Sequence, residues 1–317
     1  MKINRILFPI DFSEHSRALN QKVAALANFF GAKLTLMHVF EIPGGWYGTI
    51  EVPIINTEYF TAFADAVRQR LTEYTIDVPE SRVERVLAEG DAARQIAHHV
   101  KEHAIDLVVI GTHGHGVLRR LLLGSVVMKV LHDVPCPVWT YHQHGAGADD
   151  YGADAAKSPV STIVCSLELT EEAVPLLRFT QDLAGVFGAE VHLVHVIPGM
   201  NATSYEYFDA AFEADLKDAA EQTIAKLQRE AATDFPSVVL SDGSIVQDVA
   251  EFAQEKHADL VVIGRGKAQL TFGSVRTHAY EIIRYAHCPL LSYSAGHEHQ
   301  TAGTTPPGAS RGEREVA

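Results

Sequence analysis

The sequence is poor in cysteine and has no long apolar run. Its three cysteines, Cys136, Cys165 and Cys288, form no CxxC pair, and such sparse spacing suits a reducing compartment better than a disulfide framework. The chain reaches Asp11 before an apolar region of signal length develops, and no stretch approaches the roughly 18 apolar residues of a membrane span. We therefore expect a cytoplasmic protein that has no membrane as partner.

Positive charge is also scarce. The 40 Asp and Glu residues outnumber the 26 Lys and Arg residues, the formal net charge is −14, and no basic cluster is longer than Arg119-Arg120. Nucleic acids and anionic membranes both require a cationic face on their partner. The charge balance therefore argues against either as the main partner.

Three common active-site motifs are missing. The sequence contains no GxxxxGK[ST], no GxGxxG and no GxSxG motif. Their absence weakens the case for a P-loop ATPase, for a dinucleotide oxidoreductase and for a hydrolase with a serine nucleophile elbow.

An internal repeat organises the chain. Residues 30–39 match residues 187–196, residues 106–111 match residues 259–264, and Cys136-Pro137 matches Cys288-Pro289. A repeat of this length is a whole domain, and a chain of 317 residues suits two domains. We therefore expect two homologous domains joined by a polar linker and followed by a disordered tail. Their boundaries are 1–142 and 159–294 for the domains, 143–158 for the linker and 295–317 for the tail.

Within each half, short apolar runs alternate with segments of helical period. The strands predicted in the first half, each apolar enough to be buried on both faces, are 5–10, 34–39, 82–87, 107–110 and 138–141. Asp91 and Ser244 stand where helix N-caps belong. Alternating strands and helices predict a parallel sheet covered on both faces. The fold class is therefore α/β, with two tandem Rossmann-like domains that each hold a five-stranded, parallel, doubly wound sheet.

A glycine motif follows the fourth predicted strand. Gly111, Gly114, Gly124 and Ser125 form the pattern G-x2-G-x9-G-S, in which glycines let main-chain N–H groups approach a phosphate and the opening of a helix favours an anion. Asp11, after the first strand, would accept hydrogen bonds from ribose hydroxyls. Plainer interpretations exist: Gly111 and Gly114 could form a tight turn, and Asp11 could cap a helix.

These features resemble the universal stress protein family. The resemblance rests on residues 6–16, the strand Leu36-Met37-His38-Val39, the complete glycine motif and the closing residues 134–138, and it covers about 1–142 and, more weakly, 158–294. It implies the ATP-binding branch, a strand order of 3-2-1-4-5 in each domain, and a main-chain contact to adenine at Val39. ATP would be the ligand, with any Mg²⁺ or Mn²⁺ carried by its phosphates. The nucleotide-binding residues implied in the first domain are Pro9, Asp11, Val39, Gly111, His113, Gly114, Gly124, Ser125, Val126 and Val127.

The second half departs from this pattern. The replacements are Glu168 for Asp11, Ser166 for Pro9, Lys267 for the second glycine, and Arg276-Thr277 for Gly124-Ser125. We therefore expect one nucleotide, bound in the first half. We also expect the two closing strands, 138–141 and 290–293, to pair about a pseudo-twofold axis. A homodimer stays open as a further arrangement.

The leading hypothesis is a stress-response protein that holds an adenine nucleotide, with a second domain that is structural or regulatory. Catalysis is not required. A slow ATPase or adenylyl-transfer enzyme would use the same pocket, and only His113, His115, Arg119 and Arg120 are near enough in sequence to assist it. A scaffold that binds no nucleotide is the third alternative. The 17 histidines do not converge on fixed elements, so no dedicated metal site is expected.

Overall fold

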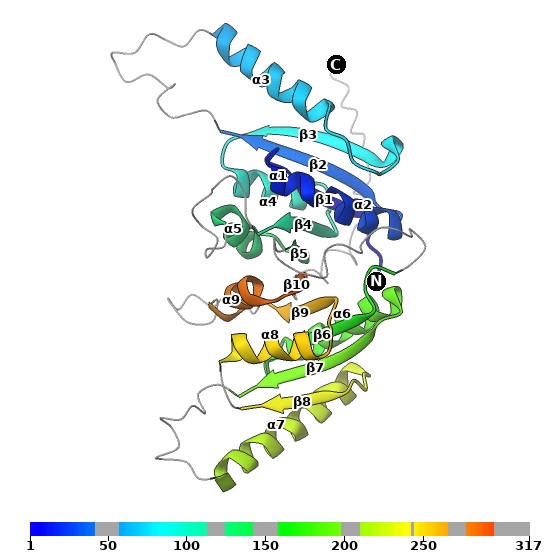
Figure 1. Ribbon diagram of the computed structural model, residues 1–317, viewed down its shortest axis with the longest axis vertical. Helices are drawn as coiled ribbons and strands as arrows, with labels where there is room; N and C mark the ends of the chain where they lie inside the picture. The colour runs from blue at the N-terminus through cyan, green and yellow to red at the C-terminus, as the bar shows by residue number, and fades with distance from the viewer. Residues whose placement is uncertain are drawn as a thin grey trace, which may run out of the picture.

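The computed structural model describes residues 1–41, 57–112, 124–141, 158–197, 210–241, 244–265 and 277–294. The tail predicted at 295–317 and all but the last residue of the predicted linker lie outside these ranges, as do His113 and Gly114. The described strands form one ten-stranded sheet that runs through both halves of the chain (Figure 1).

The first half contains the five predicted strands in the predicted order. They are β1 (Arg5–Pro9), β2 (Lys33–Phe40), β3 (Val83–Glu89), β4 (Leu107–Gly111) and β5 (Val138–Tyr141). Their order in the sheet is β3-β2-β1-β4-β5, and all four pairings are parallel. One expectation was wrong: β3 is only half-buried, because it lies at the outer edge of the sheet and has a neighbouring strand on one side only.

The second half repeats this arrangement. Its strands are β6 (Thr162–Ser166), β7 (Glu190–Val196), β8 (Ser237–Leu240), β9 (Leu260–Gly264) and β10 (Leu290–Tyr293). They follow the order β8-β7-β6-β9-β10, again with parallel pairings. The sequence repeat is therefore a repeat of the whole doubly wound unit.

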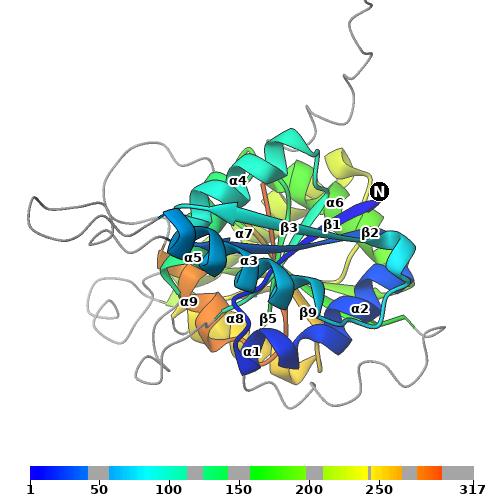
Figure 2. The ribbon, with the colours of Figure 1, turned by 90° about the horizontal axis from the view of Figure 1, so that it is seen from above.

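Helices cover both faces of the sheet. One apolar core packs under α1 (Glu14–Ala18), α2 (Asn20–Phe29), α3 (Thr57–Thr72), α6 (Ala173–Phe187) and α7 (Ala210–Ala231). The other core packs under α4 (Ala92–Glu102), α5 (Ser125–Asp133), α8 (Ile245–Glu255) and α9 (Thr277–Tyr285). Figure 2 shows α4 on one side of the strands and α1 and α2 on the other.

Both predicted N-caps are found. Asp91 caps α4 by accepting a hydrogen bond from the Arg94 N–H at 2.9 Å. Ser244 is the N-cap residue of α8, although its side chain makes no capping bond. A single 3-10 turn, η2 (Glu80–Arg82), leads into β3.

The two halves join through their last strands, as predicted. β5 and β10 pair antiparallel, with Thr140 opposite Leu290, Trp139 opposite Leu291 and Val138 opposite Ser292. Trp139 and Leu291 are each the second residue after a Cys-Pro pair, so they occupy equivalent positions. A pair of equivalent residues facing each other places the pseudo-twofold axis between them.

Aromatic side chains close the junction on the α2 and α6 side of the sheet. The Phe187 ring stacks on Phe29 with centroids 5.1 Å apart and meets the edge of Phe30 at 5.5 Å. Trp139 lies 6.2 Å from Phe187 and is fully buried. One continuous core therefore spans the two halves, and the sheet does not end at the domain boundary.

A repeated aspartate fixes the opposite end of the central strands. Asp106 Oδ2 accepts hydrogen bonds from the N–H groups of Asn4 and Arg5 at 2.7 and 2.9 Å. Asp259 Oδ2 does the same for Ser161 and Thr162, at 2.8 and 3.0 Å. Both carboxylates lie where β1 and β6 begin, so the repeated aspartate holds the fold together and does not belong to a site at the carboxyl ends of the strands.

Buried His99 on α4 makes stability depend on pH. Burial lowers the pKa of its imidazole from 6.5, and His103, with ring centroids 4.1 Å apart, lowers it further. The other charged or titratable groups that act on it are Glu84, Glu102 and His98. In the unfolded chain the His99 imidazole binds a proton near pH 6.5, whereas in the folded chain it binds one only at lower pH. The free energy of unfolding should therefore fall as pH drops below 6.5.

Urea unfolding of wild type and His99→Leu at pH 7.5 and pH 5.5 measures this effect. The variant should lose less stability on acidification than wild type. His287→Leu, at an exposed position of the second half and not among the groups that act on His99, is the control and should keep the wild-type dependence. An identical pH dependence in wild type and His99→Leu would contradict the prediction.

Candidate functional site

The first-half residues singled out from the sequence converge at the junction of β1 and β4. These strands are neighbours in the sheet, paired at Ile6 with Leu107 and Leu7 with Val108. The helices that follow them, α1 and α5, pack on opposite faces, so the connections leave the sheet in opposite directions. Such a switch point leaves a crevice outside the carboxyl ends of the strands. Pro9, Asp11 and Gly111 all lie at this edge.

Asp11 is held in place by two serines. Its Oδ1 accepts hydrogen bonds from the Ser13 N–H at 3.0 Å, from the Ser13 hydroxyl at 2.5 Å and from the Ser16 hydroxyl at 2.5 Å. The N-cap of α1 is Ser13, which accepts from the Ser16 N–H at 3.1 Å, so the interpretation of Asp11 as a helix cap is wrong. The two serines were missed in the sequence, where their D-x-S-x-x-S spacing was the available signal.

The residue after Asp11 adopts a rare conformation. Phe12 has a φ of +60°, a left-handed geometry that costs a bulky residue about 1 to 3 kcal/mol. Its buried ring packs against His38, with centroids 4.3 Å apart, and under the Arg70 guanidinium at 4.6 Å. His38 Nδ1 donates to the Ile10 carbonyl at 2.8 Å. Packing and this hydrogen bond offset the strain and hold the turn that carries Asp11.

Val39 lies on the neighbouring strand, beyond the end of β1. The β1 and β2 pairing stops at Pro9 and Met37, while β2 continues to Phe40 and pairs with β3 on its other side. The half-buried Val39 therefore lies past the last paired residue of β1, at the carboxyl edge of the sheet.

Gly124 is the N-cap residue of α5 and the third glycine of the glycine motif. Its N–H donates to the Thr112 carbonyl at 3.1 Å, and Thr112 is in turn tied to the Tyr141 carbonyl by its own N–H at 3.1 Å. A Cβ at residue 124 would lie 3.4 Å from the Thr112 oxygen. Gly111 belongs to β4 and pairs with Tyr141, so the alternative of a tight turn is not seen at this residue.

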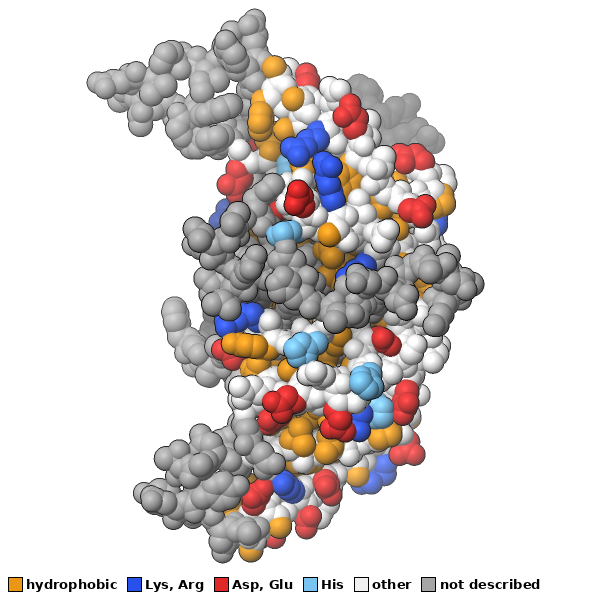
Figure 3. All heavy atoms as spheres, in the orientation of Figure 1, with side chains coloured by type: hydrophobic (Ala, Val, Ile, Leu, Met, Phe, Trp, Pro, Cys, Tyr) orange, Lys and Arg blue, Asp and Glu red, His pale blue; other side chains and the backbone are white. Residues whose placement is uncertain are grey.

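The first turn of α5 presents main-chain donors. The first helical hydrogen bond runs from the Met128 N–H to the Gly124 carbonyl, so the N–H groups of Ser125, Val126 and Val127 precede the helical ladder. The N-cap residue, a glycine, has no side chain to satisfy them. On the described surface visible in Figure 3, acidic and basic side chains are interspersed. The free N–H groups at such a helix end attract an anion.

A salt bridge fixes α5 against α4. Lys129 Nζ lies 2.8 Å from Asp91 Oδ2, and this hydrogen bond, followed by that from the Arg94 N–H, lowers the pKa of the Asp91 carboxyl. Asp91 thus caps one helix and holds the next.

Comparison with known proteins identifies the family. The family model described as "Universal stress protein family" matches residues 2–142 and again residues 159–293. This chain belongs to the universal stress protein family. It is 33% identical over 141 residues to Universal stress protein A homolog 1 of Coxiella burnetii, a match that covers 44% of this chain and 95% of that one. Universal stress protein G of Escherichia coli O157:H7 is 32% identical over 134 residues, 40% of this chain and 91% of its own.

A solved structure matches nearly the whole molecule. A universal stress protein from Archaeoglobus fulgidus superposes with a TM-score of 0.61, covering 92% of this chain and 97% of its own at 17% sequence identity. The agreement extends over both halves and supports the tandem arrangement of the fold.

The second half of this universal stress protein lacks the features built around Asp11. Glu168 is exposed, and the N-cap of α6 is Glu172, which makes no side-chain capping bond. Among the described residues, Leu169 does not share the left-handed conformation of Phe12. The scaffold itself is kept, because His195 Nδ1 donates to the Leu167 carbonyl at 2.8 Å just as His38 does in the first half.

The glycine motif is also replaced in the second half. Helix α9 begins at Thr277 as α5 begins at Ser125, which agrees with the alignment of Arg276-Thr277 on Gly124-Ser125. Lys267 and Arg276 lie outside the described residues. Arg265 occupies the position of Thr112, since its N–H donates to the Tyr293 carbonyl at 2.8 Å in the same way as Thr112 does to Tyr141.

Within the described ranges, no group of three or more His, Cys, Asp or Glu side chains is arranged to hold a metal ion. No helix in the same ranges is long and apolar enough to cross a membrane. Burial raises the pKa of the Cys136 and Cys165 thiols to about 12, which keeps them protonated and unreactive near neutral pH.

Proposed function

We propose that this universal stress protein binds one adenine nucleotide, ATP, in the crevice between Asp11 and the N-terminus of α5. The second half would have a structural or regulatory role, in a protein of the cytoplasm. The observation that carries the proposal is the placement of a fixed carboxylate beside a glycine-capped helix end at the switch point of the sheet. Nucleotide sites of doubly wound sheets share two elements, an acidic side chain that binds the ribose and a helix N-terminus that binds the phosphates.

Each part of the nucleotide has a proposed partner. The phosphates would accept hydrogen bonds from the N–H groups of the first turn of α5 and from the Ser125 hydroxyl. Asp11 would accept from the ribose hydroxyls, and Val39 would offer its main chain to adenine. The other residues proposed to line the site are Pro9, Gly111, His113 and Gly114.

The observed geometry fits a phosphate group. A Cβ at residue 124 would make an ordinary van der Waals contact, 3.4 Å from the Thr112 oxygen, and the glycine leaves the N–H groups of the first turn of α5 uncovered by a side chain of its own. Since the described residues contain no cluster of metal ligands, a Mg²⁺ or Mn²⁺ would be carried by the phosphates and would neutralise part of their charge.

Domains at 1–142 and 159–294 and a disordered tail at 295–317 complete the proposal.

Titration calorimetry of the nucleotide-free protein with ATP tests the proposal. Wild type should bind one equivalent. Asp11→Ala should weaken binding about tenfold, because a lost hydrogen bond to a charged group costs about 1.5 kcal/mol. Glu168→Ala removes the counterpart carboxylate in the second half and should leave the affinity unchanged.

Three results would count against the proposal. Two equivalent sites would show that the second half also binds. An effect of Glu168→Ala equal to that of Asp11→Ala would place the site elsewhere. Absence of binding, together with absence of any co-purifying nucleotide by mass spectrometry, would favour a scaffold that holds no nucleotide.

A further inference from the structure

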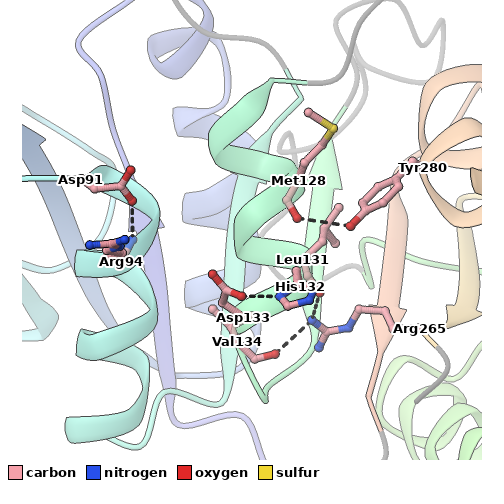
Figure 4. Close-up of polar contacts among 9 residues, drawn as sticks. All are labelled: Asp91, Arg94, Met128, Leu131, His132, Asp133, Val134, Arg265 and Tyr280. Carbon is pink, nitrogen blue, oxygen red and sulfur yellow. Dashed lines mark hydrogen bonds and ion pairs between the residues drawn. The ribbon is translucent and has the colours of Figure 1, made fainter. Parts of the chain in front are cut away.

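Arg265 belongs to the second half and contacts helix α5 of the first half. The N-terminus of this helix forms part of the candidate site. The Nη1 of Arg265 donates to the carbonyls of Leu131 at 2.7 Å and Val134 at 3.0 Å, and its Nη2 donates to the carbonyl of Cys136 at 2.5 Å. Figure 4 shows the guanidinium pointing across the junction to the C-terminal end of α5. All three acceptors belong to the last turn of that helix or to the turn into β5.

Arg265 is half-buried, with its guanidinium enclosed, and the observed partners of this cation are carbonyl oxygens. Burial lowers the pKa of its guanidinium to about 10, so it stays protonated at neutral pH. None of the ion pairs found among the described residues involves it. The last carbonyls of a helix carry the negative end of its dipole, and they take the place of a carboxylate partner.

Thr112 makes no equivalent contact to the second half within the described residues. Thr112, the equivalent residue of the first half, is too short to cross the junction, and its hydroxyl donates at 3.2 Å to Tyr141 of its own half. A second contact also comes from the second half: the Tyr280 hydroxyl on α9 donates to the Met128 carbonyl of α5 at 3.3 Å. Helix α5 is therefore held from outside its own domain.

We infer that Arg265 is a positioning residue of the second half for the phosphate end of the nucleotide site in the first half. This inference rests on the proposed function. The nine-residue helix α5 is a rigid body whose two ends have different tasks: its first N–H groups face the proposed phosphates, and its last carbonyls are fixed by Arg265. The cation also adds to the positive potential along the helix axis, in the direction that favours an anion at the other end.

The inference gives the second half a defined role. In the first half, Thr112 follows β4 and leads into the glycine motif. Its counterpart after β9, Arg265, makes an interdomain contact instead. One half would then keep the ligand site, while the other supplies a residue that orders it. By thermodynamic linkage, bound ATP should stabilise the junction by the same free energy by which the junction stabilises bound ATP.

Binding of ATP and adenosine to the full chain separates a positioning role from a general loss of structure. Arg265→Met removes the three donors and keeps an apolar chain of similar length. We expect ATP affinity to fall at least about fivefold, whereas adenosine, which has no phosphate, should bind as it does to wild type. Arg265→Lys, which retains the charge, should recover part of the ATP affinity.

Arg178→Met is the matched control. Arg178 Nη2 donates at 2.9 Å to the carbonyl of Glu230 near the end of α7, so it contacts a helix end in the same way but within the second half. This variant should bind ATP like wild type.

The outcomes distinguish this inference from the proposed function. If wild type binds neither ligand, the proposed function fails and takes the inference with it. If wild type binds both and Arg265→Met weakens ATP and adenosine equally, or weakens neither, the proposed function stands and the inference is overturned. Selective loss of ATP in Arg265→Met, with partial recovery in Arg265→Lys, supports it.

Discussion

Replacing Gly124 with valine should weaken ATP binding about a hundredfold while leaving the protein folded. Its φ of −60° and ψ of 141° are accessible to any residue, so the backbone tolerates the change. A Cβ, however, would lie 3.4 Å from the Thr112 oxygen and 3.8 Å from Val127. The two further methyl groups of valine would cover the N–H groups of the first turn of α5, and several charged hydrogen bonds would be lost together.

Calorimetric titration measures the loss, and thermal unfolding without ligand shows whether the fold is kept. Gly185→Ala is the control, because a Cβ at that position in α6 meets nothing within 4 Å, and its affinity for ATP should match wild type. An affinity of Gly124→Val within twofold of wild type would remove α5 from the phosphate site.

Trp139→Ala should cause the largest loss of stability. Trp139 is fully buried beside the pseudo-twofold axis, where it faces Leu291 and packs near Phe187. Truncating a buried aromatic residue of this size costs about 3 to 5 kcal/mol, equivalent to a fall in melting temperature of roughly 10 °C. Because the cavity would open in the core shared by both halves, we expect them to unfold less cooperatively.

Trp139→Phe separates lost packing from lost hydrogen bonding. The Trp139 Nε1 is buried and makes no hydrogen bond within the described part of the chain, so phenylalanine removes an unsatisfied donor while it keeps most of the ring. We expect a loss below about 1.5 kcal/mol in chemical unfolding. Equal losses in both variants would show that Nε1 has a partner that matters.

Much of the fold could be predicted from the sequence because the signals are local and occur twice. Buried parallel strands are short apolar runs, and the repeat of residues 106–111 at 259–264 indicates that one unit is used twice. The closing strands could be placed together because an apolar edge strand needs a partner. The half-buried state of β3 was missed because burial on both faces was predicted from its apolar residues alone, although the implied strand order already placed the third strand at the edge.

The candidate site was predicted in part. Residue types and spacing pointed to Asp11, Gly124 and Ser125, and the structure brings these residues to one edge of the sheet. The sequence showed neither that Ser13 and Ser16 hold the carboxylate nor that Phe12 turns into a left-handed conformation. Both depend on side-chain contacts between the β1 turn and its surroundings, and spacing alone does not specify them.

By itself the sequence determined the tandem repeat, the doubly wound class and the half in which the nucleotide motif is complete, and its resemblance to the family implied the strand order within each half. Only the tertiary structure decided the register in which the two closing strands pair, and that Arg265 contacts the other half. The physical reason is that periodicity and propensity act over a few neighbouring residues. A buried guanidinium finds its acceptors more than a hundred residues away, and only packing brings them within reach.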